Sequence, residues 1–357
     1  MFFQCVVSDL RRNFRDRDFI RTSEGFLFCV IGSVHPADRV ISYIKYIPAQ
    51  EGMWGRSEER FQRIMRYYTM LDLINTLRFL ENHPEYLFYS DVMDVKMSAV
   101  PINKIYAHFK PEEKIKGMAN SDKLDSLQSK ALNLVIDISD ESGVPLKYFG
   151  VTGSILLDIH QDFSDIDLTV YGVENSKRVI ESMKQIYLSG KYGVRKFNEN
   201  ESREWCLNKA RMYPLTIEDA KNILNKKWNR GVFQGTMFSI HPVKLEDEIN
   251  EKYGDRIFRS KGLVRVKATV LEDSEVDFMP SVYLVEDVKV LEGPSVKDIR
   301  EIVSYEGLYS GIASKGEKVM AYGKLEKVIN MRRNEEYHRV LVGSQEAFGR
   351  DYIKPLS

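Results

Sequence analysis

The chain has 357 residues, of which 43% are hydrophobic and 29% are charged. This length favours two or three domains, and the composition excludes wholesale disorder. Lys and Arg together number 52, and Asp and Glu also number 52, so the net charge is zero. A neutral chain is a poor candidate for coating nucleic acid non-specifically, although a local basic cleft is compatible with it.

The three cysteines, Cys5, Cys29 and Cys206, lie far apart and form no C-x-x-C pair. This usage argues against a disulfide framework or a zinc cluster and is typical of reduced, buried thiols. No segment approaches the roughly 18 apolar residues of a membrane helix. The short apolar run at the N-terminus lacks a charged leader, so it predicts a first strand rather than a signal peptide. We therefore expect a cytoplasmic protein with no membrane partner.

The first region, residues 1–117, is predicted to be an α+β domain. Gly25–Gly32 and Arg39–Ile47 are β-rich and flank a Pro-Asp turn, which favours a strand pair. The arginines between residues 11 and 17 alternate with aspartates and predict a solvated charged segment. A helix is expected after the strand pair, from apolar residues at three- and four-residue spacing. These residues are Phe61, Ile64, Met65, Tyr68 and Leu71.

The second region, residues 118–252, alternates helices and strands, which implies an α/β sheet domain. A polar segment at Lys110–Lys114 marks the boundary before it, and Ser121 is the predicted cap of a first helix that ends at Gly143. The elements expected after this helix are a strand at Leu146–Val151, a turn at Gly153-Ser154, a helix at Ile155–His160, a strand at Asp165–Tyr171, a helix around Val179–Tyr187 and a strand at Gly231–Val243.

The last region, residues 253–357, contains strand-like runs punctuated by glycines, which favours a small β-barrel-like domain. Met331–Arg333 is predicted to be a hairpin tip within it. The predicted strands are Leu263–Leu271, Val282–Val290, Ile299–Tyr305, Lys318–Val328 and Tyr337–Val342.

The most informative stretch is residues 150–172, where two carboxylates alternate along a predicted strand. Side chains two apart on a strand point the same way, so Asp165 and Asp167 are expected to converge on one cation. Carboxylate oxygens suit Mg²⁺, which normally also binds substrate phosphates. Gly153 permits a tight turn, and Ser154 presents a hydroxyl and backbone N–H groups to a phosphate at the head of a helix.

A lone pair of acids on a strand is more often an exposed edge or a capping pair, because like charges on one face repel. The Gly-Ser turn and the hydrophobic residues around the acids favour the functional interpretation here. Gly153-Ser154, ten intervening residues and Asp165-Ile166-Asp167-Leu168 resemble the signature of the DNA polymerase β-type nucleotidyltransferase superfamily. That superfamily includes CCA-adding enzymes, poly(A) polymerases and antibiotic nucleotidyltransferases. The whole chain also resembles uncharacterised archaeal proteins predicted to be nucleotidyltransferases.

The resemblance implies an α+β and α/β multidomain fold, in which a nucleotidyltransferase core with a mixed sheet lies between the N-terminal α+β domain and the C-terminal β-barrel-like domain. It implies that Gly153 and Ser154 hold the β- and γ-phosphates of a nucleoside triphosphate. Asp165 and Asp167 would ligate Mg²⁺ (or Mn²⁺), and an acceptor hydroxyl would attack the α-phosphorus and release pyrophosphate.

The superfamily normally has a third carboxylate on a later strand, but the corresponding segment, Gly231–Val243, contains no acid. His241 is the candidate to replace it as a ligand or general base, because it shares a strand face with Met237 and Ser239. A surface or hydrogen-bonding histidine is the competing interpretation. Other acids that would complete the site are Glu246, Asp247, Glu275 and Asp277.

Basic and aromatic residues between Arg203 and Arg230 would neutralise a triphosphate and stack on a base, although amphipathic surface helices show the same pattern. Arg230 is the preferred phosphate ligand, since it directly precedes the strand predicted from Gly231. We therefore expect Mg²⁺-dependent transfer of a nucleoside monophosphate to an acceptor hydroxyl, with RNA as one candidate acceptor. The alternative is a nucleotide- or RNA-binding protein that has the same core without catalysis. The sequence indicates neither the base preference nor the oligomeric state.

Overall fold

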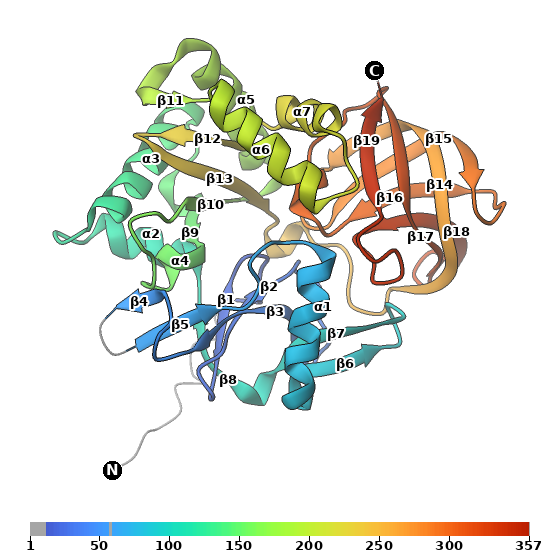
Figure 1. Ribbon diagram of the computed structural model, residues 1–357, viewed down its shortest axis with the longest axis horizontal. Coiled ribbons are helices and arrows are strands. Elements are labelled where there is room, and N and C mark those ends of the chain that lie inside the picture. The colour runs from blue at the N-terminus through green and yellow to red at the C-terminus, as the bar shows by residue number, and fades with distance from the viewer. Residues whose placement is uncertain (1–11, 57–58, 357) are drawn as a thin grey trace.

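The computed structural model describes residues 12–56 and 59–356, and within them the chain forms three β-sheets and seven α-helices. The sheets follow one another along the chain, and Figure 1 shows the N-terminal sheet below, the central sheet at the upper left and the C-terminal sheet at the upper right. This arrangement confirms a mixed α/β chain built around several sheets. The strand predicted at the extreme N-terminus lies mainly outside the described residues. No helix in the described ranges is long and apolar enough to cross a membrane.

The N-terminal sheet has eight strands and carries helix α1 (Met70–Phe79). The predicted pair is confirmed, since β2 and β3 run antiparallel with Cys29 opposite Tyr43. The strands are β1 (Phe19–Thr22), β2 (Leu27–Val30), β3 (Arg39–Pro48), β4 (Trp54–Arg56), β5 (Glu59–Arg63), β6 (Leu87–Ser90), β7 (Val95–Pro101) and β8 (Ile105–Phe109).

The helix predicted from Phe61 to Leu71 is wrong. Phe61 lies in β5, which pairs with β3, and a loop follows before α1 begins at Met70. Phe61 and Met65 are both buried, so the apolar pattern came from a strand and a packed loop rather than from one helical face. The true start of the helix carries a cap, because the Thr69 side chain accepts a hydrogen bond from the Asp72 N–H.

The central sheet has the strand order β11-β12-β13-β10-β9. Strands β10 and β13 are parallel and the other neighbours are antiparallel, so the predicted mixed sheet is confirmed. Its strands are β9 (Phe149–Thr152), β10 (Ile166–Tyr171), β11 (Val194–Arg195), β12 (Arg230–Phe233) and β13 (Thr236–Val243). The helices of this part are α2 (Pro111–Ala119), α3 (Ser126–Ser142), α4 (Gly153–Leu156), α5 (Val173–Ser189), α6 (Glu199–Met212) and α7 (Ile217–Lys226).

Three predicted features of the central region need correction. Asp125, not Ser121, caps α3, where it forms a capping box with Gln128. The helix after the Gly-Ser turn, α4, is only four residues long. The segment predicted as one strand, Gly231–Val243, is a hairpin of β12 and β13 whose turn includes Gln234 and Gly235, both with positive φ.

The C-terminal sheet has six strands in the order β14-β15-β16-β18-β17-β19, and β14 also pairs with β17. All five predicted strands are present, and the hairpin tip at Met331–Arg333 is confirmed. The sixth strand, β19, was not predicted. The strands are β14 (Arg256–Glu275), β15 (Ser281–Glu292), β16 (Ile299–Ser304), β17 (Lys318–Asn330), β18 (Glu335–Val342) and β19 (Tyr352–Leu356).

The hydrophobic clusters cross the predicted domain limits at two places. Ile115 and Met118 of α2 pack into the core of the central sheet, although α2 begins in the predicted polar boundary segment. Leu215, just before α7, and Ile223, within α7, pack into the core of the C-terminal sheet. Helix α2 is therefore part of the central core, and α7 ties the central region to the core of the C-terminal sheet.

The arginine-rich segment before β1 is not a solvated charged run as predicted. The Arg12 side chain is 11% exposed and pairs with Asp18, which is fully buried, and with Glu112 of α2. Arg15 pairs with Glu246 beyond the central sheet. Burial of these guanidinium groups beside carboxylates ties the N-terminal segment to the central region.

Candidate functional site

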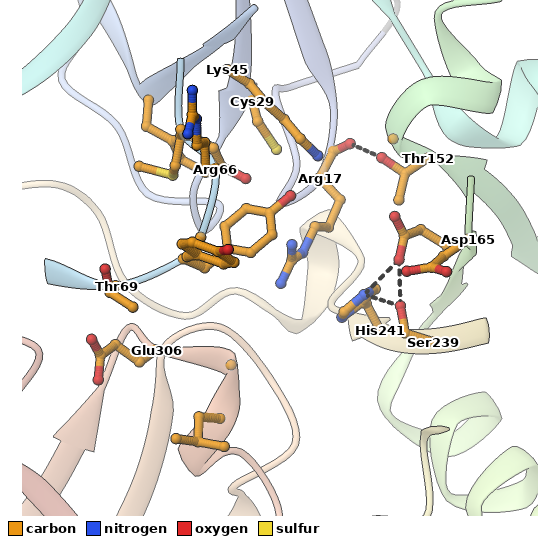
Figure 2. Close-up of a pocket in the computed structure, with 18 of the residues that line it drawn as sticks. Arg17, Cys29, Lys45, Arg66, Thr69, Thr152, Asp165, Ser239, His241 and Glu306 are labelled. Carbon is orange, nitrogen blue, oxygen red and sulfur yellow. Dashed lines mark hydrogen bonds and ion pairs between the residues drawn. The ribbon is translucent and has the colours of Figure 1, made fainter. Parts of the chain in front are cut away.

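The two candidate acids lie where the central sheet faces a cleft. Asp165 directly precedes β10, and Asp167 lies within it, opposite Ser239 on one neighbouring strand and Thr152 on the other. The parallel register of β10 and β13 places His241 opposite Thr169, on the same side of the sheet as Ser239. Figure 2 shows Asp165, Ser239 and His241 together at one side of this cleft.

Gly153 is required at its position for two reasons. Its φ is 69°, in the left-handed region, and a Cβ there would lie 2.8 Å from Oδ2 of Asp167. The turn therefore brings the backbone directly against the carboxylate. Ser154 follows and also lines the cleft. Since α4 is so short, a helix dipole contributes little here, and phosphate binding would rest on the Ser154 hydroxyl and the N–H groups of the turn.

Asp167 is held by β13. The Ser239 hydroxyl donates a hydrogen bond of 2.5 Å to Oδ1 of Asp167, and Nε2 of His241 lies 2.9 Å from the Ser239 oxygen and 3.9 Å from the same Oδ1. Because Ser239 gives its proton to Asp167, Nε2 of His241 carries the proton that it donates to Ser239. His241 thus acts on the carboxylate through Ser239.

The pKa values of the two acids are shifted in opposite directions. Burial, and then the charge of Asp167, raise the pKa of Asp165 to about 6. Although burial also opposes ionisation of Asp167, its pKa lies below the ordinary value, because His241, Lys45 and Ser239 favour the carboxylate. Burial lowers the pKa of His241 to about 4. The imidazole is therefore neutral at pH 7, and the cationic stabilisation of Asp167 at that pH comes from Lys45.

The cleft has a volume of about 530 Å³ and lies between all three sheets. Its lining includes residues of the N-terminal sheet, the central sheet, α6 and the segment after β16. Cationic side chains outnumber acidic ones in the lining. The cations are Arg17, Lys45, Arg63, Arg66, Lys209, Lys227 and Arg230, and the acids are Asp16, Asp165, Asp167 and Glu306.

Most residues predicted for the site reach this cleft. Gly153, Ser154, Asp165, Asp167 and His241 all line it, and so does Arg230 at the start of β12. From the predicted basic and aromatic stretch, Trp205, Lys209, Tyr213 and Lys227 line it as well.

The four acids proposed to complete the site are directed elsewhere. Glu246 pairs with Arg15, and Glu275 pairs with Lys244 at 2.5 Å. Asp277 accepts a hydrogen bond of 2.8 Å from the Trp228 indole. Neither these three acids nor Asp247 belongs to the lining of the cleft. None of the four acids therefore lies beside Asp165 and Asp167 in this structure.

The sequence interpretation missed the cations of the N-terminal sheet. Lys45 lies in β3, between residues that are buried on both sides, and is itself 5% exposed. Arg17 precedes β1 and was assigned to solvent. A lysine within an otherwise apolar, aromatic strand was the available signal for Lys45. Nothing in the sequence indicates that these residues meet Gly153 and Asp165.

The side chains fit a divalent cation only if a bound ligand completes its coordination. In the part of the chain that the structure describes, no group of three or more His, Cys, Asp or Glu residues is placed to hold a metal ion. Asp165 and Asp167 supply two carboxylates, and burial, followed by the charge of Asp167, raises the pKa of Asp165. Mg²⁺ is commonly bound by one or two carboxylates together with substrate phosphates and water.

The fold and cleft define a multi-sheet α/β protein with a carboxylate pair in a cation-rich pocket. The chain is 31% identical over 345 residues to the uncharacterized protein MJ1086 of Methanocaldococcus jannaschii, an alignment that covers 95% of this chain and 98% of that protein. The chain therefore belongs to the same family as MJ1086. No protein-family model matches it, and no solved structure matches it.

Proposed function

We propose that the protein is a nucleotidyltransferase of the DNA polymerase β type, which moves a nucleoside monophosphate from a nucleoside triphosphate to an acceptor hydroxyl. One observation carries the proposal: Asp165 and Asp167 face a cation-rich cleft directly beside the Gly153-Ser154 turn. A metal-bound triphosphate needs ligands for the metal and cations for its phosphates. Here the two carboxylates would bind the metal, the turn leaves room for the phosphates, and the surrounding cations would offset the phosphate charge.

Each residue has a defined part in this reaction. The Ser154 hydroxyl and the N–H groups of the turn bind and orient the phosphates, and Arg230 offsets their charge. Asp165 and Asp167 would hold Mg²⁺ (or Mn²⁺), which when bound polarises the phosphoryl group and stabilises the leaving oxygen. His241 positions Asp167 through Ser239. The acceptor oxygen bonds to the α-phosphorus, the bond to the β-phosphate oxygen breaks, and the hydroxyl proton passes to solvent.

The test is pyrophosphate release from each labelled triphosphate with Mg²⁺ or Mn²⁺ and a pool of RNA acceptors. Asp165→Asn and Asp167→Asn should abolish release. Asp162→Asn is the matched control, because Asp162 is an exposed acid in the same loop that does not line the cleft; this variant should keep the activity. Release that survives both active-site substitutions would contradict the proposal.

A nucleotide- or RNA-binding protein without turnover is the second candidate. The observation that favours it is the cleft's lack, among the described residues, of a third carboxylate beside Asp165 and Asp167. Binding of Mg²⁺ and triphosphate would then raise the thermal stability of the protein, while no pyrophosphate forms with any acceptor. A thermal shift that Asp165→Asn removes, without product, would establish this function in place of the enzyme. The proposal also includes RNA as a candidate acceptor or ligand and a cytoplasmic location for the protein.

A further inference from the structure

Lys45 is a buried cation that forms no direct ion pair among residues 12–56 and 59–356, although its charge acts at longer range on Asp167. Its Nζ lies over three rings, 5.4 Å from the ring centroid of Phe19, 5.6 Å from that of Tyr46 and 5.2 Å from that of Tyr68. These cation–π contacts lessen the cost of removing an ammonium group from water, but a buried cation is normally paired with an anion as well. Lys45 also lines the cleft, so an anion bound there would complete the pair.

Arg17 is fixed beside the Gly-Ser turn by its backbone. Its φ is 71°, a left-handed conformation that is costly for a side chain of this size. Two hydrogen bonds hold it there, from its own N–H to the Val30 carbonyl at 3.1 Å and from the Thr152 hydroxyl to its carbonyl at 2.7 Å. Thr152 immediately precedes Gly153, so the position of Arg17 is tied directly to the turn.

The side chain of Arg17 is only partly satisfied. Its Nε lies 3.3 Å from Oδ2 of Asp16, yet this nitrogen is buried and forms no hydrogen bond. Figure 2 shows Lys45 close to Arg17, with the Arg17 backbone beside Thr152 and the Arg17 side chain pointing into the middle of the cleft. Two incompletely compensated cations therefore lie in the cleft near the turn.

We propose that Lys45 and Arg17 bind the phosphate chain of the nucleoside triphosphate opposite the Gly153-Ser154 turn, so that the nucleotide bridges the N-terminal and central sheets. This inference rests on the proposed function. A polyphosphate is the class of ligand that fits, because it presents several anionic oxygens at once to cations on two walls. A single carboxylate would meet only one of them.

The test is calorimetric titration of the full chain with Mg²⁺-ATP and, separately, with inorganic tripolyphosphate and Mg²⁺. Lys45→Met keeps the length of the side chain and removes the charge, and we expect both ligands to bind roughly ten- to a hundredfold more weakly. Lys45→Arg should restore most of the affinity. Lys116→Met is the matched control, since Lys116 is exposed on α2 outside the cleft, and it should bind like the wild type.

The outcomes separate this inference from the function on which it rests. If the wild type binds both ligands and Lys45→Met binds them equally well, the assignment of Lys45 and Arg17 is overturned while the proposed function stands. If the wild type binds neither ligand, both are overturned. Arg17→Lys is the second variant should Lys45→Met fail to give a folded far-UV spectrum. This variant retains a charge but not the guanidinium geometry, so unchanged affinity for tripolyphosphate would count against phosphate binding by Arg17.

Discussion

Replacing Gly153 with Ala separates a backbone effect from an effect on the candidate site. Gly153 has a φ of 69°, and Gly190 at the end of α5 has a φ of 66°. An alanine in the left-handed region costs about 1–2 kcal/mol at either position. The two sites differ in what a Cβ would meet, since nothing lies within 4 Å at Gly190, whereas Oδ2 of Asp167 lies 2.8 Å away at Gly153.

The Asp167 side chain can rotate away from an alanine at position 153, which relieves the clash but removes the carboxylate from the Ser239 hydroxyl. That charged hydrogen bond has a net value of about 1.5–3 kcal/mol. We therefore expect Gly153→Ala to lower the free energy of unfolding, measured in urea, by about that amount more than Gly190→Ala does. Only Gly153→Ala should lose the thermal shift that Mg²⁺ and ATP produce. Full retention of that shift by Gly153→Ala would refute the close contact between the turn and Asp167.

Three further predictions concern acidic side chains. Burial and the neighbouring carboxylate of Asp167 raise the pKa of Asp165 to about 6, so protons compete with the cation below that pH. The affinity for Mn²⁺ with ATP, measured by titration, should therefore rise up to about pH 6 and then level off. Burial raises the pKa of Glu306 to about 8. The protonated Glu306 side chain contributes fully to stability below the ordinary pKa of Glu, and this contribution is lost as the pH rises towards 8. Glu306→Gln should therefore melt like the wild type at pH 4 but be more stable at pH 9, by up to about 1.4 kcal/mol per unit of pKa shift. Glu326 is 1% exposed and pairs with Arg339 at 2.7 Å, so Glu326→Gln should lower the free energy of unfolding in urea by about 3–5 kcal/mol. The control, Glu292→Gln, changes an exposed acid and should lower it by less than about 1 kcal/mol. Equal losses would contradict the burial argument.

Local patterns predicted the elements that carry the carboxylate pair. Apolar residues alternating with Asp165 and Asp167 indicated β10, and the glycine before Ser154 indicated the turn, because both signals depend only on neighbouring residues. The same kind of reasoning failed between Phe61 and Leu71, where apolar residues from β5, a loop and α1 imitate helical spacing. Hydrophobic periodicity records burial, and burial in this segment is imposed by packing against β3 rather than by a helix.

The composition of the cleft could not be predicted, because it depends on contacts between distant segments. Lys45 lies in β3 of the N-terminal sheet and Arg17 just before β1, whereas Asp165 directly precedes β10 of the central sheet and Glu306 follows β16 of the C-terminal sheet. The acids nearest in sequence to β13 were the natural candidates for a third ligand, yet Glu246 is bound to Arg15. Which acid is free and which is paired is decided by tertiary contacts, and an isolated sequence contains no local signal for them.

The neutral total charge of the chain hides a strong separation of charge. Acids and bases are equal in number over the whole sequence, but cations exceed acids in the lining of the cleft, so the rest of the chain carries the compensating excess of acid. A cleft with low-dielectric walls concentrates that local field. The arrangement favours a small, highly charged anion held at one point over a long polyanion spread across the surface. If RNA is the acceptor, only its end would have to enter the cleft, and its binding should depend on salt far less steeply than that of a protein that contacts many phosphates.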